Sequence, residues 1–249
     1  MVSLLRRWRS ERRQELLSPE LIAIDGRQIE VKFKRHNRAR RLIVRLDRKG
    51  GAVTVTVPPR ASRKEALAFV DKSRAWIAAR LARQPQAVAF APGVEIMLRG
   101  TLHVITHEPD RRGLVRIAAD PDRIIVPGDV AHLKRRLTDW LKREAKRDLL
   151  EASDHHARAI GVTFSKLSVR DQASRWGSCT ADGSLSYSWR LVLAPSHVLD
   201  YVAVHEVAHL KHMNHGMRFW RLVLAHCPHA GEARSWLRHH GASLHRYGG

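Results

Sequence analysis

Cysteines and long apolar runs are largely missing from this sequence. Its 249 residues include two cysteines, Cys179 and Cys227, which are too few for a disulfide framework. The opening residues, MVSLLRRWRSERRQELL, lack the apolar segment that a secretory signal requires. No stretch approaches the roughly 18 uninterrupted apolar residues that a membrane-spanning helix needs. These absences argue against a disulfide-rich secreted protein and against a membrane protein, and we expect a soluble, cytoplasmic one.

Acidic residues and aromatic rings are also scarce relative to basic residues. The 45 Lys and Arg outnumber the 24 Asp and Glu, which gives a formal net charge of +21 and a sequence pI near 11.3. Residues 1–50 contain 15 basic and 6 acidic residues. This charge favours polyanionic partners, but with three Tyr and five Phe no basic segment resembles a base-stacking surface. Sequence-specific nucleic-acid binding is not supported, whereas nonspecific contact with nucleic acid and a merely solvated basic surface are both open.

The first half of the chain, residues 1–128, has the alternating apolar pattern of β-strands. Strands are predicted between Leu21 and Val57, with a turn at Asp25-Gly26 and a hairpin turn at Lys49 to Gly51. Short strands separated by Gly, Pro and Asp are predicted again between Val94 and Val126. The sequence therefore predicts a basic, β-rich N-terminal region.

One helix interrupts this region. Ser62, with Glu65 three residues later, forms a capping box that opens a predicted helix to about Arg83. The candidate buried positions of this helix are Leu67, Val70, Trp76, Ile77 and Leu81.

The second half, residues 129–249, is dominated by helical spacing. A long helix is predicted from Val130 to about Ile160, followed by strands that meet at the Asp182-Gly183 turn and extend through LSYSWRLVLA. Ser196 is the expected N-cap of a helix that runs to Met213, and a further helix follows. A strand-rich half and a helix-rich half together predict an α+β fold.

The segment His205-Glu206-Val207-Ala208-His209 carries the clearest chemical signal. Residues four apart lie on one face of a helix, so the imidazoles of His205 and His209 can converge on one metal ion. Glu206 projects about 100° further round the helix, beside the open position of the metal. A zinc ion with three protein ligands lowers the pKa of its bound water to about 7, and Glu206 can then act as general base. The pattern predicts metal-assisted hydrolysis.

The residues around this segment are apolar or small, among them Val202, Ala203 and Leu210. Such surroundings are typical of a packed helix and disfavour a pair of surface histidines. Core histidines that are satisfied by hydrogen bonds are the remaining structural alternative.

A third ligand is needed, and His212 and His215 are the candidates. A helix that continued to His212 would place it about 10.5 Å along the axis from His205, at 1.5 Å per residue, which is too far for two ligands of one zinc ion. His215 lies beyond the point at which the helix can end and the chain can turn back. We therefore predict His205, His209 and His215 as zinc ligands, and His212 as an exposed helix-end residue.

The segment Arg175-Trp176-Gly177-Ser178-Cys179, upstream of this helix, has two interpretations. In the first, Trp176 lines the active-site cleft, and Arg175 or Ser178 also lines it and stabilises a developing oxyanion or a phosphate. Alternatively, Trp176 packs, Gly177 permits a bend and Cys179 is a small buried hydrophobe. A fourth zinc ligand at Cys179 would close the open position and is not expected. The following histidines have irregular spacing and predict surface solvation or weak metal affinity: His226, His229, His239, His240 and His245.

Several segments together resemble the YgjP-like metallopeptidase family, which is related to the SprT and WLM zinc proteases. They are RWGSC, SYSWRLVLAP, DYVAVHEVAHLKHMNHGMRFW, and the upstream VTVTVPP and AFVDKSRAWI, so the resemblance covers nearly the whole chain. In that family the histidines of HExxHxxxxxH bind zinc and the glutamate is catalytic, which implies these roles for His205, His209, His215 and Glu206. It also implies a zincin-like metallohydrolase domain in residues 129–249. Gly216, where similar sequences commonly have Ser, is tolerable as a helix N-cap.

Three functions are compatible with these observations. The first, favoured by the resemblance, is a metallopeptidase that acts on a polypeptide substrate. The second is a phosphohydrolase with the same zinc site, because members of the family have been associated with UTP pyrophosphatase activity and a basic chain suits a triphosphate. The third is a nucleic-acid-associated module in which the zinc is structural.

Overall fold

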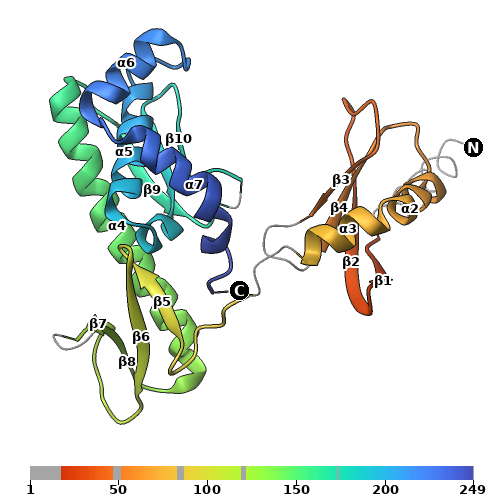
Figure 1. The fold of residues 1–249 in the computed structure, drawn as a ribbon, viewed down its shortest axis with the longest axis horizontal. Helices are drawn as coiled ribbons and strands as arrows, with labels where there is room; N and C mark the ends of the chain where they lie inside the picture. Colours follow the sequence, from red (N-terminus) through yellow and green to blue (C-terminus); the bar gives the residue numbers. More distant parts are fainter. Residues whose placement is uncertain (1–17, 47–51, 83–86, 119–121, 173, 249) are drawn as a thin grey trace, which may run out of the picture. The chain divides into compact units, whose positions relative to one another are not determined.

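The computed structural model describes residues 18–46, 52–82, 87–118, 122–172 and 174–248. Within these ranges helices and strands are mixed in an α+β fold, as the sequence predicted. The chain divides into two compact units, residues 1–86 and 87–249 (Figure 1). Each unit has its own hydrophobic core. Across the described ranges, no helix has both the length and the apolar character needed to cross a membrane.

The N-terminal unit is a four-stranded sheet with two helices packed on it. Its elements are β1 (Glu20–Ile24), β2 (Arg27–Arg35), β3 (Ile43–Leu46), β4 (Ala52–Val57), α2 (Arg63–Lys72) and α3 (Arg74–Ala82). The strands lie in the order β1-β2-β4-β3, with β2 and β4 parallel and the other two pairs antiparallel. Buried residues alternate along β2 and β4, because successive side chains of a strand point to opposite faces. The buried face packs on the helices and forms the core of this unit.

Both predicted hairpins pair as expected. β1 and β2 are joined at Asp25 and Gly26, whose φ angles of 47° and 74° are those of a tight hairpin turn. β3 and β4 are also antiparallel neighbours. The turn predicted at Lys49 to Gly51 lies outside the described residues.

The helical segment after Ser62 starts as predicted but is broken in the middle. Ser62 Oγ accepts a hydrogen bond from the backbone N–H of Glu65, and the Glu65 carboxylate accepts one from the backbone N–H of Ser62. The prediction of one continuous helix to about Arg83 is wrong, because α2 ends just before Ser73 and α3 begins just after it. The Ser73 hydroxyl donates to the carbonyl of Phe69 at 2.8 Å, a side-chain bond that often bends helices.

One residue of the segment that was predicted to be buried is exposed. Trp76 is 52% exposed. The buried residues Val70, Ile77 and Leu81 keep helical spacing across the break, and Trp76, about 100° round the helix from Ile77, lies outside this buried face. The other predicted positions are buried or half-buried: Leu67, Val70, Ile77 and Leu81.

The C-terminal unit contains two small sheets and four helices in its described part. The strands are β5 (Glu95–Leu98), β6 (Thr101–Glu108), β7 (Arg116–Ile117), β8 (Arg123–Pro127), β9 (Lys166–Arg170), β10 (Gly177–Cys179) and β11 (Ser184–Ser188). The helices are α4 (Leu133–Ile160), α5 (Ser196–His209), α6 (Met217–His226) and α7 (Ala230–Leu244), with 3-10 turns η1 (Val130–His132) and η2 (Trp189–Leu193). The sheets have the orders β5-β6-β8-β7 and β10-β11-β9.

The division between the units differs from the predicted boundary. The sequence placed it between residues 128 and 129, whereas the compact units divide between Gln86 and Ala87. Apolar residues of β5, β6 and β8 share one core with α4 and α5, which assigns these strands to the C-terminal unit: Ile96, Leu98, Ile105, Ile124 and Val126. Strand content alone could not reveal this, because it does not show which core a strand joins.

Three local predictions near the centre of this unit are wrong. The run WRLVL is a 3-10 turn, η2, and not a strand; all five of its residues are buried, and a continuous apolar run does not distinguish the two. Ser196 is the first residue of α5, and the N-cap is Pro195, whose missing N–H costs nothing before a first helical turn. α5 ends at His209 rather than Met213.

Candidate metal centre

Helix α5 is enclosed by its neighbours in the C-terminal unit. It packs against α4, α6, α7 and strand β10, which lie around it in Figure 1. Its ten buried residues include apolar side chains on several faces, as expected for a helix that is surrounded by protein. A polar side chain on such a helix lies either in the core or in a cleft that the neighbours leave open.

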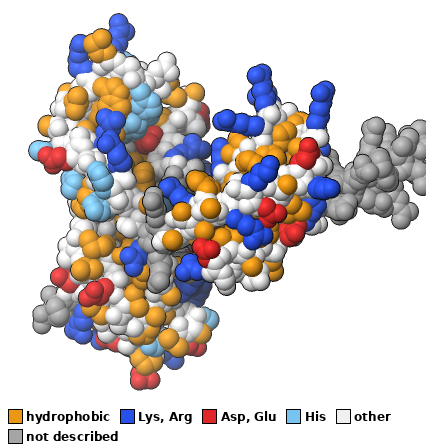
Figure 2. Space-filling model, turned by 45° about the vertical axis from the view of Figure 1, so that its right-hand side comes forward, with side chains coloured by type: hydrophobic (Ala, Val, Ile, Leu, Met, Phe, Trp, Pro, Cys, Tyr) orange, Lys and Arg blue, Asp and Glu red, His pale blue; other side chains and the backbone are white. Residues whose placement is uncertain are grey.

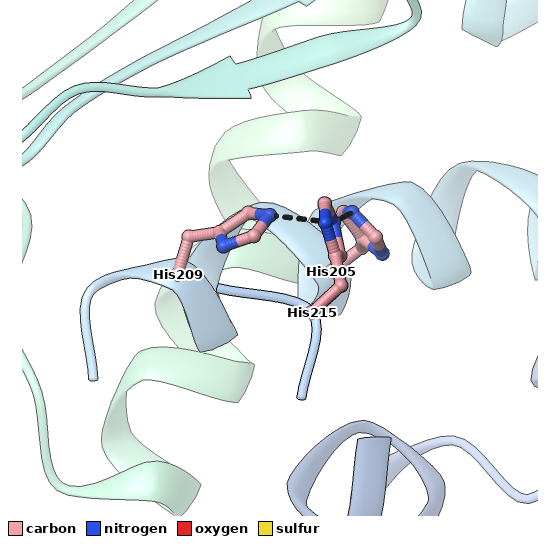
Figure 3. Close-up of side chains that lie close together, drawn as sticks. All are labelled: His205, His209 and His215. Carbon is pink, nitrogen blue, oxygen red and sulfur yellow. Dashed lines mark hydrogen bonds between the residues drawn. The ribbon is translucent and has the colours of Figure 1, made fainter. Parts of the chain in front are cut away.

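The three predicted ligand histidines come together at the C-terminal end of α5. His205 and His209 lie on the helix, one turn apart, and His215 returns from the following loop (Figure 3). The Nε2 atom of His215 lies 3.0 Å from that of His205 and 3.1 Å from that of His209. Among the described residues, this is the one group of potential metal ligands whose donor atoms lie within 4.8 Å of one another.

The spacing of these nitrogens fits a metal ion. With zinc–nitrogen distances of 2.0–2.1 Å and tetrahedral angles, two ligand nitrogens lie about 3.3 Å apart. The His215 Nε2 has close contact with two other Nε2 atoms, although a neutral imidazole carries only one N–H. Converging lone pairs on a shared cation explain this arrangement better than a set of hydrogen bonds does.

Hydrogen bonds at the opposite ring nitrogens orient two of the imidazoles. His209 Nδ1 lies 3.0 Å from the backbone carbonyl oxygen of His212, to which it can only donate. His205 Nδ1 lies 3.3 Å from the hydroxyl of Tyr201, one turn earlier on α5. A proton on Nδ1 leaves the Nε2 lone pair free for a metal, and such outer partners are typical of metal-binding histidines. His212 therefore contributes its carbonyl group, and its side chain does not join the cluster.

Two aromatic residues of α6 pack against the cluster. The Phe219 side chain is fully buried, and its ring centroid lies 4.9, 4.5 and 4.8 Å from those of His205, His209 and His215. Trp220 lies about 6 Å from two of these rings. Neither aromatic was predicted to belong to the site, although their position just after His215 was a usable signal.

Burial keeps two of the ligand candidates neutral. Burial lowers the pKa of His205 to about 4, and the nearby His209 and His215 add to this effect. The pKa of His209 is also lowered, mainly by burial. Neutral imidazoles are the form that binds metal ions, so these rings are ready to act as ligands at neutral pH.

Glu206 lies beside the cluster in an unusual environment for a carboxylate. It is 6% exposed, and burial raises its pKa to about 7, against the opposing effects of the Arg175 charge and a hydrogen bond from the Cys179 backbone. A carboxylate with a pKa near the working pH is suited to accept and release a proton. Its side chain lies directly against Gly177 of β10, where an added Cβ would come within 2.6 Å of the Glu206 Cγ and Oε1 atoms.

The segment from Arg175 to Cys179 therefore contacts the site mainly through Gly177 and backbone groups. Trp176 lines the cleft described below and also packs on His245, with ring centroids 5.0 Å apart. Arg175 acts on Glu206 through its charge. Ser178 lies in β10, opposite Ser186 of β11, and is not among the residues that line the cleft. The cleft-lining roles of Arg175 and Ser178 stay predictions.

Cys179 does not belong to the metal cluster. Its thiol lies 3.5 Å from the backbone carbonyl of Thr180. Burial raises the pKa of this thiol to about 11, and the charge of Glu206 adds to the effect. A thiol that stays protonated at neutral pH is a poor metal ligand.

A cleft of about 420 Å³ opens beside Glu206 and His205. Its walls come from β10, α5 and α7, and the lining residues are Trp176, Gly177, Tyr201, Val202, His205, Glu206, Arg234, Leu237 and Arg238. Arg234 and Arg238 were not predicted from the sequence, because nothing in their spacing indicates that α7 faces the histidines. A larger hollow of about 1070 Å³, between α4 and the start of α5, contains none of the three histidines.

The chain matches the model of a known protein family. Residues 40–240 match the family described as YgjP-like, metallopeptidase domain. The match covers most of the chain and includes the histidine cluster, Glu206 and the cleft-lining residues. No curated protein and no solved structure matches the chain.

Proposed function

Because the chain belongs to the YgjP-like metallopeptidase family, we propose that it is a zinc metallopeptidase in which His205, His209 and His215 hold the ion and Glu206 is the general base. The observation that carries the proposal is the convergence of three Nε2 atoms next to one buried carboxylate. The family implies a metal-dependent hydrolase of the peptidase type. Zinc as the ion and the peptide bond as the target are the proposed refinements.

The donor set favours zinc, which imidazole nitrogen binds well. When bound, zinc would polarise the scissile carbonyl and lower the pKa of the attacking water. The chain's own contribution is to hold Glu206 where its carboxylate can take the proton from that water and later deliver it to the leaving amine. The contact with Gly177 and the hydrogen bond from Cys179 restrict the movement of this carboxylate.

A phosphohydrolase that cleaves a nucleoside triphosphate is the second candidate. The observation in its favour is that two arginines, Arg234 and Arg238, line the cleft beside Glu206. Guanidinium groups bind phosphate as well as carboxylate. This candidate uses the same zinc site and differs only in the bond that is cut.

A structural zinc in a nucleic-acid-associated module has less support. Structural zinc sites are normally closed by four protein ligands. In the described part of the chain the cluster contains three histidines and no fourth donor.

Nonspecific nucleic-acid contact through the N-terminal unit stays a prediction. Residues 1–86 contain 22 Lys and Arg against 8 Asp and Glu, and basic side chains project from this unit in Figure 2.

A substrate panel separates these functions. Zinc-loaded protein is incubated with an unfolded polypeptide and, separately, with UTP and other triphosphates, alongside protein stripped of metal. We expect cleavage of the polypeptide that disappears on metal removal and returns with zinc. Hydrolysis of UTP without cleavage of any polypeptide would overturn the peptidase proposal in favour of the second candidate.

A further inference from the structure

Two arginines on α7 face the same cleft as the metal cluster. Arg234 and Arg238 lie four residues apart on one helix, so their side chains project from the same face. Both line the 420 Å³ cleft together with His205 and Glu206. The guanidinium group of Arg234 also lies over the ring of Trp220, 4.6 Å from its centroid. This contact holds one positive charge at the wall of the cleft.

Neither arginine has a carboxylate partner among the described residues. Other arginines of this unit do, as Arg99 shows by binding Glu144 and Asp148 at 2.7 Å each. The one carboxylate of the cleft, Glu206, accepts a hydrogen bond from the Cys179 backbone. The cleft therefore contains two guanidinium groups without a matching anion in the described chain, and an anionic group of a ligand would supply one.

We propose that Arg234 and Arg238 form a subsite for a carboxylate of the polypeptide substrate, so that the enzyme selects peptides with an acidic group close to the scissile bond. This inference rests on the proposed peptidase function. Arginine suits the task because its planar fork can bind both oxygens of a carboxylate.

The spacing of the two arginines fits an extended peptide. Residues four apart on a helix are separated by about 6 Å along the axis. In an extended peptide, side chains two residues apart project to the same side, about 6.6–6.8 Å from each other. Two acidic side chains at alternate positions could each meet one arginine, and a single carboxylate could be shared by both.

The carboxylate can come from an acidic side chain or from the C-terminus of the substrate. Two peptide series distinguish these sources. One contains Asp or Glu within an amidated peptide, and the other has a free C-terminal carboxylate and neutral side chains. Matched peptides with Gln in place of the acid, or with an amidated end, provide the neutral references.

Binding is measured on zinc-loaded Glu206→Gln protein, so that the result does not depend on turnover. Fluorescence anisotropy gives the dissociation constant of each labelled peptide. We expect at least one acidic series to bind about tenfold more tightly than its neutral reference, as charge-assisted hydrogen bonds predict. In the same background, Arg234→Gln combined with Arg238→Gln should remove this preference.

The control must separate a subsite from the general attraction of a basic protein. Lys142→Gln combined with Lys146→Gln removes the same charge at the same helical spacing, from exposed positions of α4 that are not part of the cleft. This variant should keep the preference for the acidic peptide. Equal binding of acidic and neutral peptides, or a preference that survives the double arginine substitution, overturns the subsite.

Turnover tests the subsite and the proposed function separately. Arg238→Glu in the otherwise unchanged protein should reverse the preference toward peptides with Lys at the tested position, provided that its zinc content matches that of the parent. Cleavage of all peptides at equal rates, by the parent and by this variant, rejects the subsite and leaves the peptidase intact. Selective binding of acidic peptides without cleavage of any peptide rejects the peptidase and supports the subsite.

Discussion

The side chain of Glu206 occupies the space that a Cβ at residue 177 would need. An added Cβ at Gly177 would lie 2.6 Å from Cγ and Oε1 of Glu206 and 2.9 Å from its Cδ. These distances are shorter than real Cβ contacts allow, so either the strand or the carboxylate would have to move. Because Gly177 of β10 has no side chain, the carboxylate of Glu206, the proposed general base on α5, can occupy this position.

The first prediction concerns this contact. Gly177→Ala should lower kcat by about a hundredfold, because displacing a catalytic group by about 1 Å can cost that much. Zinc content should stay unchanged, since the three atoms nearest the added Cβ all belong to Glu206 and none to a ligand histidine. Gly231→Ala is the matched control, because a Cβ at Gly231 of α7 would meet nothing within 4 Å. Full activity of the Gly177→Ala protein would show that the Glu206 position is not critical.

The second prediction is a shift in pH dependence. Glu206 must be ionised to accept a proton, so activity should fall as the pH drops below its pKa. The Arg175 charge lowers the pKa of Glu206, and loss of that charge should raise it. Arg175→Gln should therefore move the acidic limb of the kcat/KM profile to higher pH. Lys166 is an exposed residue of β9, and Lys166→Gln should leave the acidic limb in place. An unmoved limb in both variants would contradict the assignment of this limb to Glu206.

The third prediction concerns the aromatic packing under the histidines. Phe219→Leu keeps an apolar side chain but loses part of the contact with all three imidazole rings. Zinc affinity should fall about tenfold, as for other groups that orient metal ligands, with a loss of about 1–2 kcal/mol in the free energy of unfolding. Leu224 lies on the same helix and is 50% exposed. Leu224→Ala should therefore leave zinc affinity unchanged. Competition with a chelator and denaturant titration measure the two quantities.

Local patterns in the sequence predicted most of the regular structure. The Ser62–Glu65 capping box, the Asp25-Gly26 turn and the end of α4 at Ile160 depend on neighbouring residues and appear in the structure as expected. The residue after Ile160 is Gly161, which adopts the left-handed φ of 75°. The failures concern properties that neighbours do not determine. Burial of Trp76 and the boundary between the units depend on which distant residues share a core.

In the candidate site, too, the features set by neighbouring residues could be predicted and those set by distant residues could not. The juxtaposition of His205 and His209 follows from helical spacing, and that of His215 follows from the end of α5. Tyr201, four residues before His205, could have been found from the same spacing. The approach of Gly177 to Glu206 and the placement of Arg234 at the cleft are tertiary contacts between elements far apart in the sequence, and no local pattern encodes them.

A comparison of Glu206→Gln with the parent protein at equal zinc content tests the role of Glu206 most directly. Glutamine has nearly the same shape as glutamate but cannot take a proton from water. We predict that metal content and the unfolding transition stay the same, while hydrolysis of an unfolded polypeptide falls by roughly 100- to 10,000-fold. Undiminished hydrolysis by the zinc-loaded Glu206→Gln protein would show that Glu206 is not the general base of a three-histidine zinc site.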